Sequence, residues 1–246
     1  MFDILFARTF VIVGCMLILT AITAKINRRF ETALELWGTI IGVFVLLFMV
    51  MSFKEDYPLN IILVALLSSI MGWSIGPTIE HFGERFKLRK FLKEKGTPLK
   101  KGESVSREQY SEFKSSVSLD SYHREWQNTV TLAVGGTATA VLATAGIVFT
   151  TDLDFSFLGG FLFIALLISV VFGFINMFFL RSKMVSLIRA YVGAVIFTLY
   201  LLYDFNQLEK KAGDESWGTA IDISVNIYLD IINLFLDLLE ILAEAD

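Results

Sequence analysis

Cysteine, histidine and proline are scarce in this chain of 246 residues, which has one, two and three of them. Because a disulfide needs two thiols, Cys15 excludes an intramolecular disulfide bond. His81 and His123 have no Cys or His at metal-ligand spacing and no nucleophile motif beside them. We therefore expect no catalytic residue, no resident cofactor and no enzymatic activity.

Apolar residues are abundant instead. They make up 55% of the chain, which includes 23 phenylalanines, and the mean hydropathy is +0.64. This composition is typical of an integral membrane protein, and no segment shows the alternation of barrel strands. We predict an all-α polytopic protein. Its residues 1–246 are expected to form a single domain of seven membrane-spanning helices. The segments of about 20 apolar residues that a span needs are Ile4–Ala24, Leu36–Phe53, Leu59–Ile79, Val130–Thr150, Phe155–Leu180, Val185–Tyr203 and Gly218–Leu242.

The distribution of basic residues predicts the orientation. If the N-terminus lies outside, 17 of the 21 Lys and Arg residues fall on the inner side. Cytoplasmic loops carry the excess of Lys and Arg, so we predict an outer N-terminus and an inner C-terminus. The bases that follow the first segment, rather than precede it, favour a retained helix over a cleaved signal peptide.

One polar insertion, residues 84–124, separates the third and fourth segments. Its first half is expected to extend the third helix until Gly96-Thr97-Pro98 ends it. The basic run Arg85–Lys101 has three readings: a solvated loop that sets topology, a surface for anionic lipid, or a docking surface for a partner protein.

The last apolar segment has a polar stripe on one side. At about 100° per residue its members fall within roughly 80° of arc on a helix. Because charged side chains are costly at the bilayer centre, the stripe predicts a cation or proton path. Its members are Asp222, Asn226, Asp230, Asn233, Asp237 and Glu240.

Some of these residues have a second interpretation. Asn226 and Asn233 could offer oxygen ligands to a hard cation or bond a neighbouring helix. Asp237, a further candidate for the path, and Glu240 could instead reach the inner interface as snorkelling acids.

Asp204, near the end of the sixth segment, is the second notable acid. An antiparallel hairpin would place it within about two turns of the depth of Asp230. Two carboxylates that approach closely share a proton or bind a cation, so the pair predicts a pH-sensing latch and a cation site in one. Alternatively, Asp204 is an interfacial residue that reaches water. A weak further alternative is an intramembrane aspartyl protease.

Pro77 and two glycine pairs bear on helix packing. Pro77 frees a backbone carbonyl in the third segment, which requires compensation by a neighbour or water. Small residues four apart permit close helix packing, and Gly72/Gly76 and Gly38/Gly42 have this spacing.

The strings around the two aspartates closely resemble a known family. Tyr200-Leu201-Leu202-Tyr203-Asp204 and Asn226-Ile227-Tyr228-Leu229-Asp230-Ile231-Ile232-Asn233-Leu234-Phe235 are similar to the paired signature of the Bax inhibitor-1 family. Gly72 to Pro77 and Asp154 to Leu158 resemble its third-helix and fifth-helix motifs. The similarity extends over all seven segments.

The resemblance implies a central seventh helix and a pH-sensitive calcium leak in a bacterial inner membrane. The family's gating dyad, with a transient calcium site, maps onto Asp204 and Asp230. Expected partners are membrane lipid and calcium, with no nucleic acid. Two departures are the absence of a base in Leu36–Phe53 and the long insertion. An alternative function is a non-conducting stress adaptor that binds a membrane protease or another membrane protein through the basic insertion.

Overall fold

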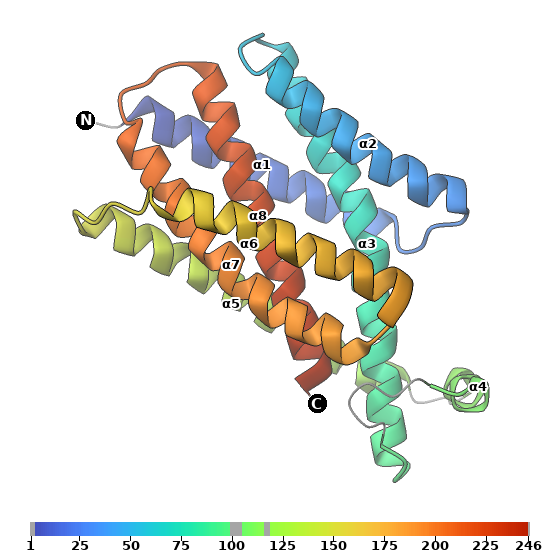
Figure 1. Cartoon of the computed structure of the whole chain (residues 1–246). Coiled ribbons are helices and arrows are strands. Elements are labelled where there is room, and N and C mark those ends of the chain that lie inside the picture. Colours follow the sequence, from blue (N-terminus) through green and yellow to red (C-terminus); the bar gives the residue numbers. More distant parts are fainter. Residues whose placement is uncertain (1–2, 99–104, 116–118, 246) are drawn as a thin grey trace. The chain divides into compact units, whose positions relative to one another are not determined.

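The computed structural model describes residues 3–98, 105–115 and 119–245. Over these ranges the chain is helical and has no strand, which confirms the all-α class (Figure 1). The elements in chain order are α1 (Ile4–Ile26), α2 (Ala33–Ser52), α3 (Leu59–Glu94), α4 (Arg107–Ser115), α5 (Leu119–Thr150), α6 (Leu158–Ile175), the π-helical turn η1 (Asn176–Leu180), α7 (Lys183–Lys210) and α8 (Trp217–Ala245).

Six stretches of the described helices are long and apolar enough to cross a membrane. They are Ile4–Ile26, Ala33–Ser52, Leu59–Glu94, Tyr122–Thr150, Leu158–Leu180 and Lys183–Lys210. Each contains one of the first six predicted segments or most of it. The helix α8 (Trp217–Ala245) is not among them. A seven-span count is therefore not confirmed by length and composition alone.

Contacts divide the chain into two compact units. Unit 1 comprises Met1–Glu80, Thr144–Ser156 and Leu201–Asp230, and unit 2 comprises His81–Ala143, Phe157–Tyr200 and Ile231–Asp246. Four helices, α3, α5, α7 and α8, contribute one part to each unit. The single membrane domain stays a prediction.

In unit 1, α1 and α3 cross with almost no space between their backbones. A methyl group at Gly72 would overlap Thr23 Oγ1 and the Thr20 carbonyl oxygen. A methyl group at Gly76 would likewise overlap the carbonyl oxygens of Ala24 and Asn27. These contacts support the packing role of this glycine pair. The other pair is different, since Gly42 approaches the flexible end of Ile70 while Gly38 has no atom within 4 Å of its Cβ position.

The same crossing compensates for Pro77, which lies inside α3. A proline has no N–H to donate to the carbonyl four residues earlier. That carbonyl belongs to Trp73, and the side-chain amide of Asn27 donates to it at 2.8 Å. A neighbouring helix end thus supplies the missing donor, as the sequence predicted for a proline in a spanning helix.

The first half of α8 is closely packed within unit 1. The side chains of Ala220, Ile221, Val225 and Tyr228 are completely buried. The Tyr228 hydroxyl lies 2.6 Å from Thr20 Oγ1, which donates to the Ser68 carbonyl at 3.0 Å. Hydroxyl groups therefore connect α8 to α1 and α3.

In unit 2, the insertion has a small core of its own. The helix α3 ends where Gly96 takes a φ of 77°, and Thr97 N–H donates to the Leu92 carbonyl at 3.0 Å. Glycine suits this left-handed helix end, which confirms the predicted stop. The short helix α4 then packs Phe113 against α3 and α5, in a cluster of Leu88, Phe91, Leu92, Phe113 and Tyr122.

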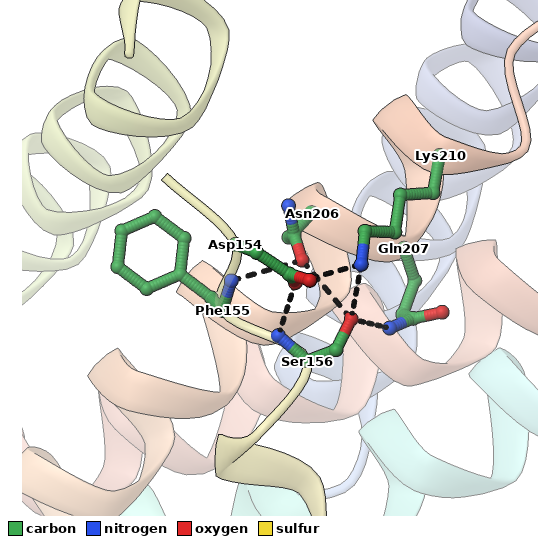
Figure 2. A network of polar contacts seen from close by, with 6 residues as sticks. All are labelled: Asp154, Phe155, Ser156, Asn206, Gln207 and Lys210. Atoms are coloured by element: carbon green, nitrogen blue, oxygen red, sulfur yellow. Dashed lines mark hydrogen bonds and ion pairs between the residues drawn. The ribbon is translucent and has the colours of Figure 1, made fainter. Parts of the chain in front are cut away.

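A polar network in unit 1 holds the loop before α6 against the end of α7 (Figure 2). Asp154 Oδ1 accepts from Lys210 Nζ at 2.7 Å and from the Ser156 N–H at 2.8 Å. The buried Asn206 accepts from the Phe155 N–H at 3.1 Å. The Lys210 ammonium group, with the Ser156 donors, lowers the pKa of Asp154 to about 2.

Alanine at Gly72 should destabilise the protein, because the new methyl group must push the α1 and α3 backbones apart. Overpacking costs about 1–3 kcal/mol, so we expect the thermal midpoint in detergent to fall by several degrees. The matched control is Gly38→Ala, where space is open and alanine favours the helix. An unchanged midpoint in Gly72→Ala would show that this crossing adapts freely.

Asp154→Asn should lower the thermal midpoint slightly at neutral pH, since it removes the charge that Lys210 binds. The folded-state pKa is depressed, so this contribution is present above the ordinary value of 3.8 and disappears as the pH falls toward about 2. The difference from wild type should therefore shrink over that interval. Asp152→Asn, an exposed acid in the same loop, controls for the change in net charge and should show no such difference.

Candidate functional site

The two predicted gate residues are both buried in unit 1. Asp204 on α7 is 4% exposed, and Asp230 on α8 is 7% exposed. Asp204 therefore does not reach water as an interfacial side chain, and that alternative is wrong. Its chain neighbour Phe205 is completely buried and stacks against Phe10 of α1, which explains why α7 turns this face inward.

The side chains of Asp204 and Asp230 lie within hydrogen-bonding reach of each other. The Oδ2 atom of each has no hydrogen-bond partner among the described residues. Neither carboxyl group forms a salt bridge to a residue in the described ranges. A buried carboxylate without a partner is costly, so the pair requires a proton or a cation.

Asp222, one of the stripe residues nearer the start of α8, has a different environment. Its carboxylate lies 3.7 Å from Lys54 Nζ, and the two side chains are about one third exposed. Lys54 directly follows α2 and is the base nearest to that helix on its C-terminal side. Asn226, one turn further along α8, is exposed. The stripe in unit 1 therefore passes from accessible residues to the buried Asp230.

A second buried acid pair lies in unit 2. Asp237 and Glu240 are 4% and 5% exposed, so the prediction that they snorkel to the interface is wrong. Arg189 of α7 holds them inside, with Nη2 at 3.3 Å from Glu240 and Nη1 at 3.9 Å from Asp237. Ser186 also donates a hydrogen bond to Glu240.

Asp237 is positioned by a glycine. A methyl group at Gly193 of α7 would overlap its carboxyl group, whose Oδ2 atom has no hydrogen-bond partner among the described residues. The sequence analysis missed both Arg189 and Gly193. The available signal was their spacing, since Ser186, Arg189 and Gly193 recur three and four residues apart on one helical face.

The remaining stripe residue, Asn233, is half-buried in unit 2. The structure brings Asp204 to Asp230 and, separately, Arg189 to Asp237 and Glu240. In the described ranges, no group of three or more His, Cys, Asp or Glu side chains has an arrangement that could hold a metal ion. Any cation at Asp204 and Asp230 would thus need further oxygen ligands.

Comparison with known proteins gives a match over most of the chain. The family described as "Inhibitor of apoptosis-promoting Bax1" matches residues 4–87 and 115–246. The chain is 43% identical over 90 residues to Protein LIFEGUARD 1 of Arabidopsis thaliana, and this match covers 37% of each chain. It is 39% identical over 106 residues to the Golgi anti-apoptotic protein of Vaccinia virus (strain Lister), over 43% of each chain.

A third relative is the BI1-like protein of Arabidopsis thaliana, 39% identical over 117 residues, or 48% of this chain and 43% of the relative. The chain therefore spans about two fifths of the length of these curated relatives. The family match is much longer and includes both Asp204 and Asp230, and it leaves out most of the insertion. On this evidence the chain belongs to the Bax inhibitor-1 family.

Proposed function

We propose that this protein is a pH-sensitive leak channel that conducts calcium passively across a membrane. Asp204 and Asp230 are its gate and pH sensor. The observation that carries the proposal is their burial side by side in unit 1, each with an oxygen that has no protein partner in the described ranges. Two adjacent carboxylates cannot both be ionised in a dry site without a cation.

The proposal includes α8 as the seventh span, surrounded by the other helices. Its pairings with α7 support an antiparallel course. Near the start of α7, Arg189 contacts Glu240, and near its end Asp204 is close to Asp230. A helix that returns along the whole of a spanning helix crosses the same membrane. The burial on several sides of α8 is consistent with a central place.

Protonation state would control the gate through helix packing. With one shared proton, the two carboxyl groups hold α7 and α8 together by a hydrogen bond. With the proton lost, their repulsion favours either separation of the helices or entry of a cation. Calcium takes six to eight oxygen ligands, so two carboxylates bind it only transiently, as conduction requires.

The acidic and amide residues of α8 supply the rest of the route in this proposal. Asn226 and Asp230 belong to unit 1, and Asn233 and Asp237 follow them along the helix in unit 2. Arg189 beside Asp237 is a tethered cation with which a passing ion must compete. The orientation stays as predicted, with an outer N-terminus and an inner C-terminus in a bacterial inner membrane.

The alternative is a non-conducting adaptor that acts through the insertion on a membrane protease or another partner. One observation favours it: the family match stops at residue 87 and resumes at 115, yet α4 in this gap folds against α3 and α5. A packed element added to a family fold is suited to a role of its own. The description of the family and the name of one relative concern apoptosis rather than transport.

Asp230→Asn should abolish the pH dependence of calcium flux into proteoliposomes, because the pair can no longer exchange its proton. The measurement is dye-reported calcium entry between pH 6 and pH 8, roughly the range in which buried carboxyl pairs can exchange a proton. Asp152→Asn is the exposed control and should behave as wild type, and a chromatographic profile should verify folding. Flux with unchanged pH dependence in Asp230→Asn would remove the pair from the mechanism.

Phe113→Ser should release α4 from the apolar cluster that holds it against α3 and α5. The variant therefore distinguishes the leak channel from the adaptor. If the protein is a leak channel, calcium flux should stay at the wild-type level. If it is an adaptor, the variant should lose a defined partner that wild type retains in pull-down from its own membranes. Tyr110→Ser changes a more exposed aromatic of the same helix and serves as the control. Loss of flux in Phe113→Ser alone would place the insertion in the conducting unit.

A further inference from the structure

Unit 2 gathers basic side chains from two helices. His81, Arg85 and Arg89 are four residues apart and share one face of α3. Lys183, the first residue of α7, is close enough to Arg85 and Arg89 for their charges to repel. It also lies within electrostatic range of His81. Like charges that lie close together repel one another. An anion nearby is needed to offset this repulsion.

The protein itself supplies one anion, Glu244 near the end of α8. Its two carboxylate oxygens pair with Arg85 and Arg89, and Arg89 also bonds the Glu244 carbonyl oxygen at 3.2 Å. The Lys183 ammonium group has no ion pair and no hydrogen bond to any residue in the described ranges, although it is half-buried and the Glu244 carboxylate attracts it from a longer range. With His81 neutral, the three cations Arg85, Arg89 and Lys183 face the Glu244 carboxylate and the Glu84 carboxylate, which lies within electrostatic range of His81, so one positive charge is left over.

We propose that Arg85, Arg89 and Lys183 form a binding site for a phosphate group. Arginine forks match the oxygens of phosphate, and lysine adds a point charge. All three side chains are partly exposed, so a ligand can approach them. This proposal does not depend on calcium conduction, since none of these residues belongs to the gate or to the stripe that lines the proposed route.

The position of the site indicates where such a group comes from. The apolar part of α3 ends near Ile79, just before these bases, and α7 enters its apolar stretch directly after Lys183. Bases at that boundary lie at the level of lipid headgroups, and basic pockets between spanning helices bind anionic headgroups. A phospholipid headgroup and a free phosphate ion share the recognised chemistry, and the experiment has to separate them.

The test is the thermal midpoint of the purified full chain in detergent, titrated with phosphatidic acid, with phosphatidylcholine or with inorganic phosphate. Phosphatidic acid should raise the midpoint of wild type and phosphatidylcholine should not. A comparable rise with inorganic phosphate alone would support the site with free phosphate as its source. No rise with phosphatidic acid and none with inorganic phosphate would overturn the proposal.

Three variants locate the effect. Lys183→Gln should raise the concentration of phosphatidic acid needed for half of the midpoint shift about tenfold, the loss of affinity expected for one charge-assisted contact. The variant should still fold, because the Lys183 side chain has no hydrogen bond or ion pair in the described ranges. Lys87→Gln is the matched control on α3 and should respond as wild type. Glu244→Gln should strengthen the response, since the internal carboxylate no longer competes for the arginines. Equal losses in Lys183→Gln and Lys87→Gln would mean a general charge effect, and no loss in Lys183→Gln would show that this lysine does not contact the ligand. Either result would contradict the assignment.

Discussion

The need to neutralise acids that are buried away from water constrains the whole helical arrangement of α7 and α8. Four carboxyl groups on these helices are nine-tenths buried or more, and the sequence surrounds them with Ile, Leu, Phe and Tyr. A buried charge must be paired or lose its charge. Asp237 and Glu240 solve this with Arg189 and Ser186. Asp204 and Asp230 have each other and no salt bridge among the described residues. The two pairs therefore differ in kind: the first has a fixed counter-charge, and the second depends on what it takes from solution.

Under the proposed function, this difference would let a single helix combine rigidity with a response to pH. Around Asp230, α8 is anchored by completely buried apolar residues and by the hydroxyl contact between Tyr228 and Thr20. Around Asp237, it is anchored by the Arg189 pair and by the close fit against Gly193. In the proposed gate, the carboxyl pair at Asp204 and Asp230 would be the place on α8 where an interaction changes its sign, from a shared hydrogen bond to repulsion, without loss of a fixed ion pair. A gate needs such a two-state contact.

Much of the fold could be predicted from the sequence, because its signals are local. Hydropathy predicts the six candidate spans, and Gly96 predicts the end of α3. Pro77 predicts that a backbone carbonyl of α3 needs a hydrogen-bond donor from elsewhere. The donor itself, Asn27, could not be predicted, since it depends on how α1 crosses α3. The same limit applies to the site. Spacing placed the acids of α8 on one side, but whether an acid is paired or exposed depends on neighbours distant in sequence. The sequence allows Asp237 and Glu240 to be snorkelling acids, because their partner Arg189 is about 50 residues away from them along the chain.

The polar stripe of α8 bears on its proposed place as a seventh membrane span, since α8 is not among the six candidate spans. Acids and amides inside a bundle are compatible with a membrane when protein, rather than lipid, surrounds them. The contacts of α8 meet that condition at Asp204, at Arg189 and at the two arginines that hold Glu244. These partners lie on α7 and α3, both of which are candidate spans. In the proposal that α8 is a seventh span, these protein partners are what makes its acids compatible with the membrane.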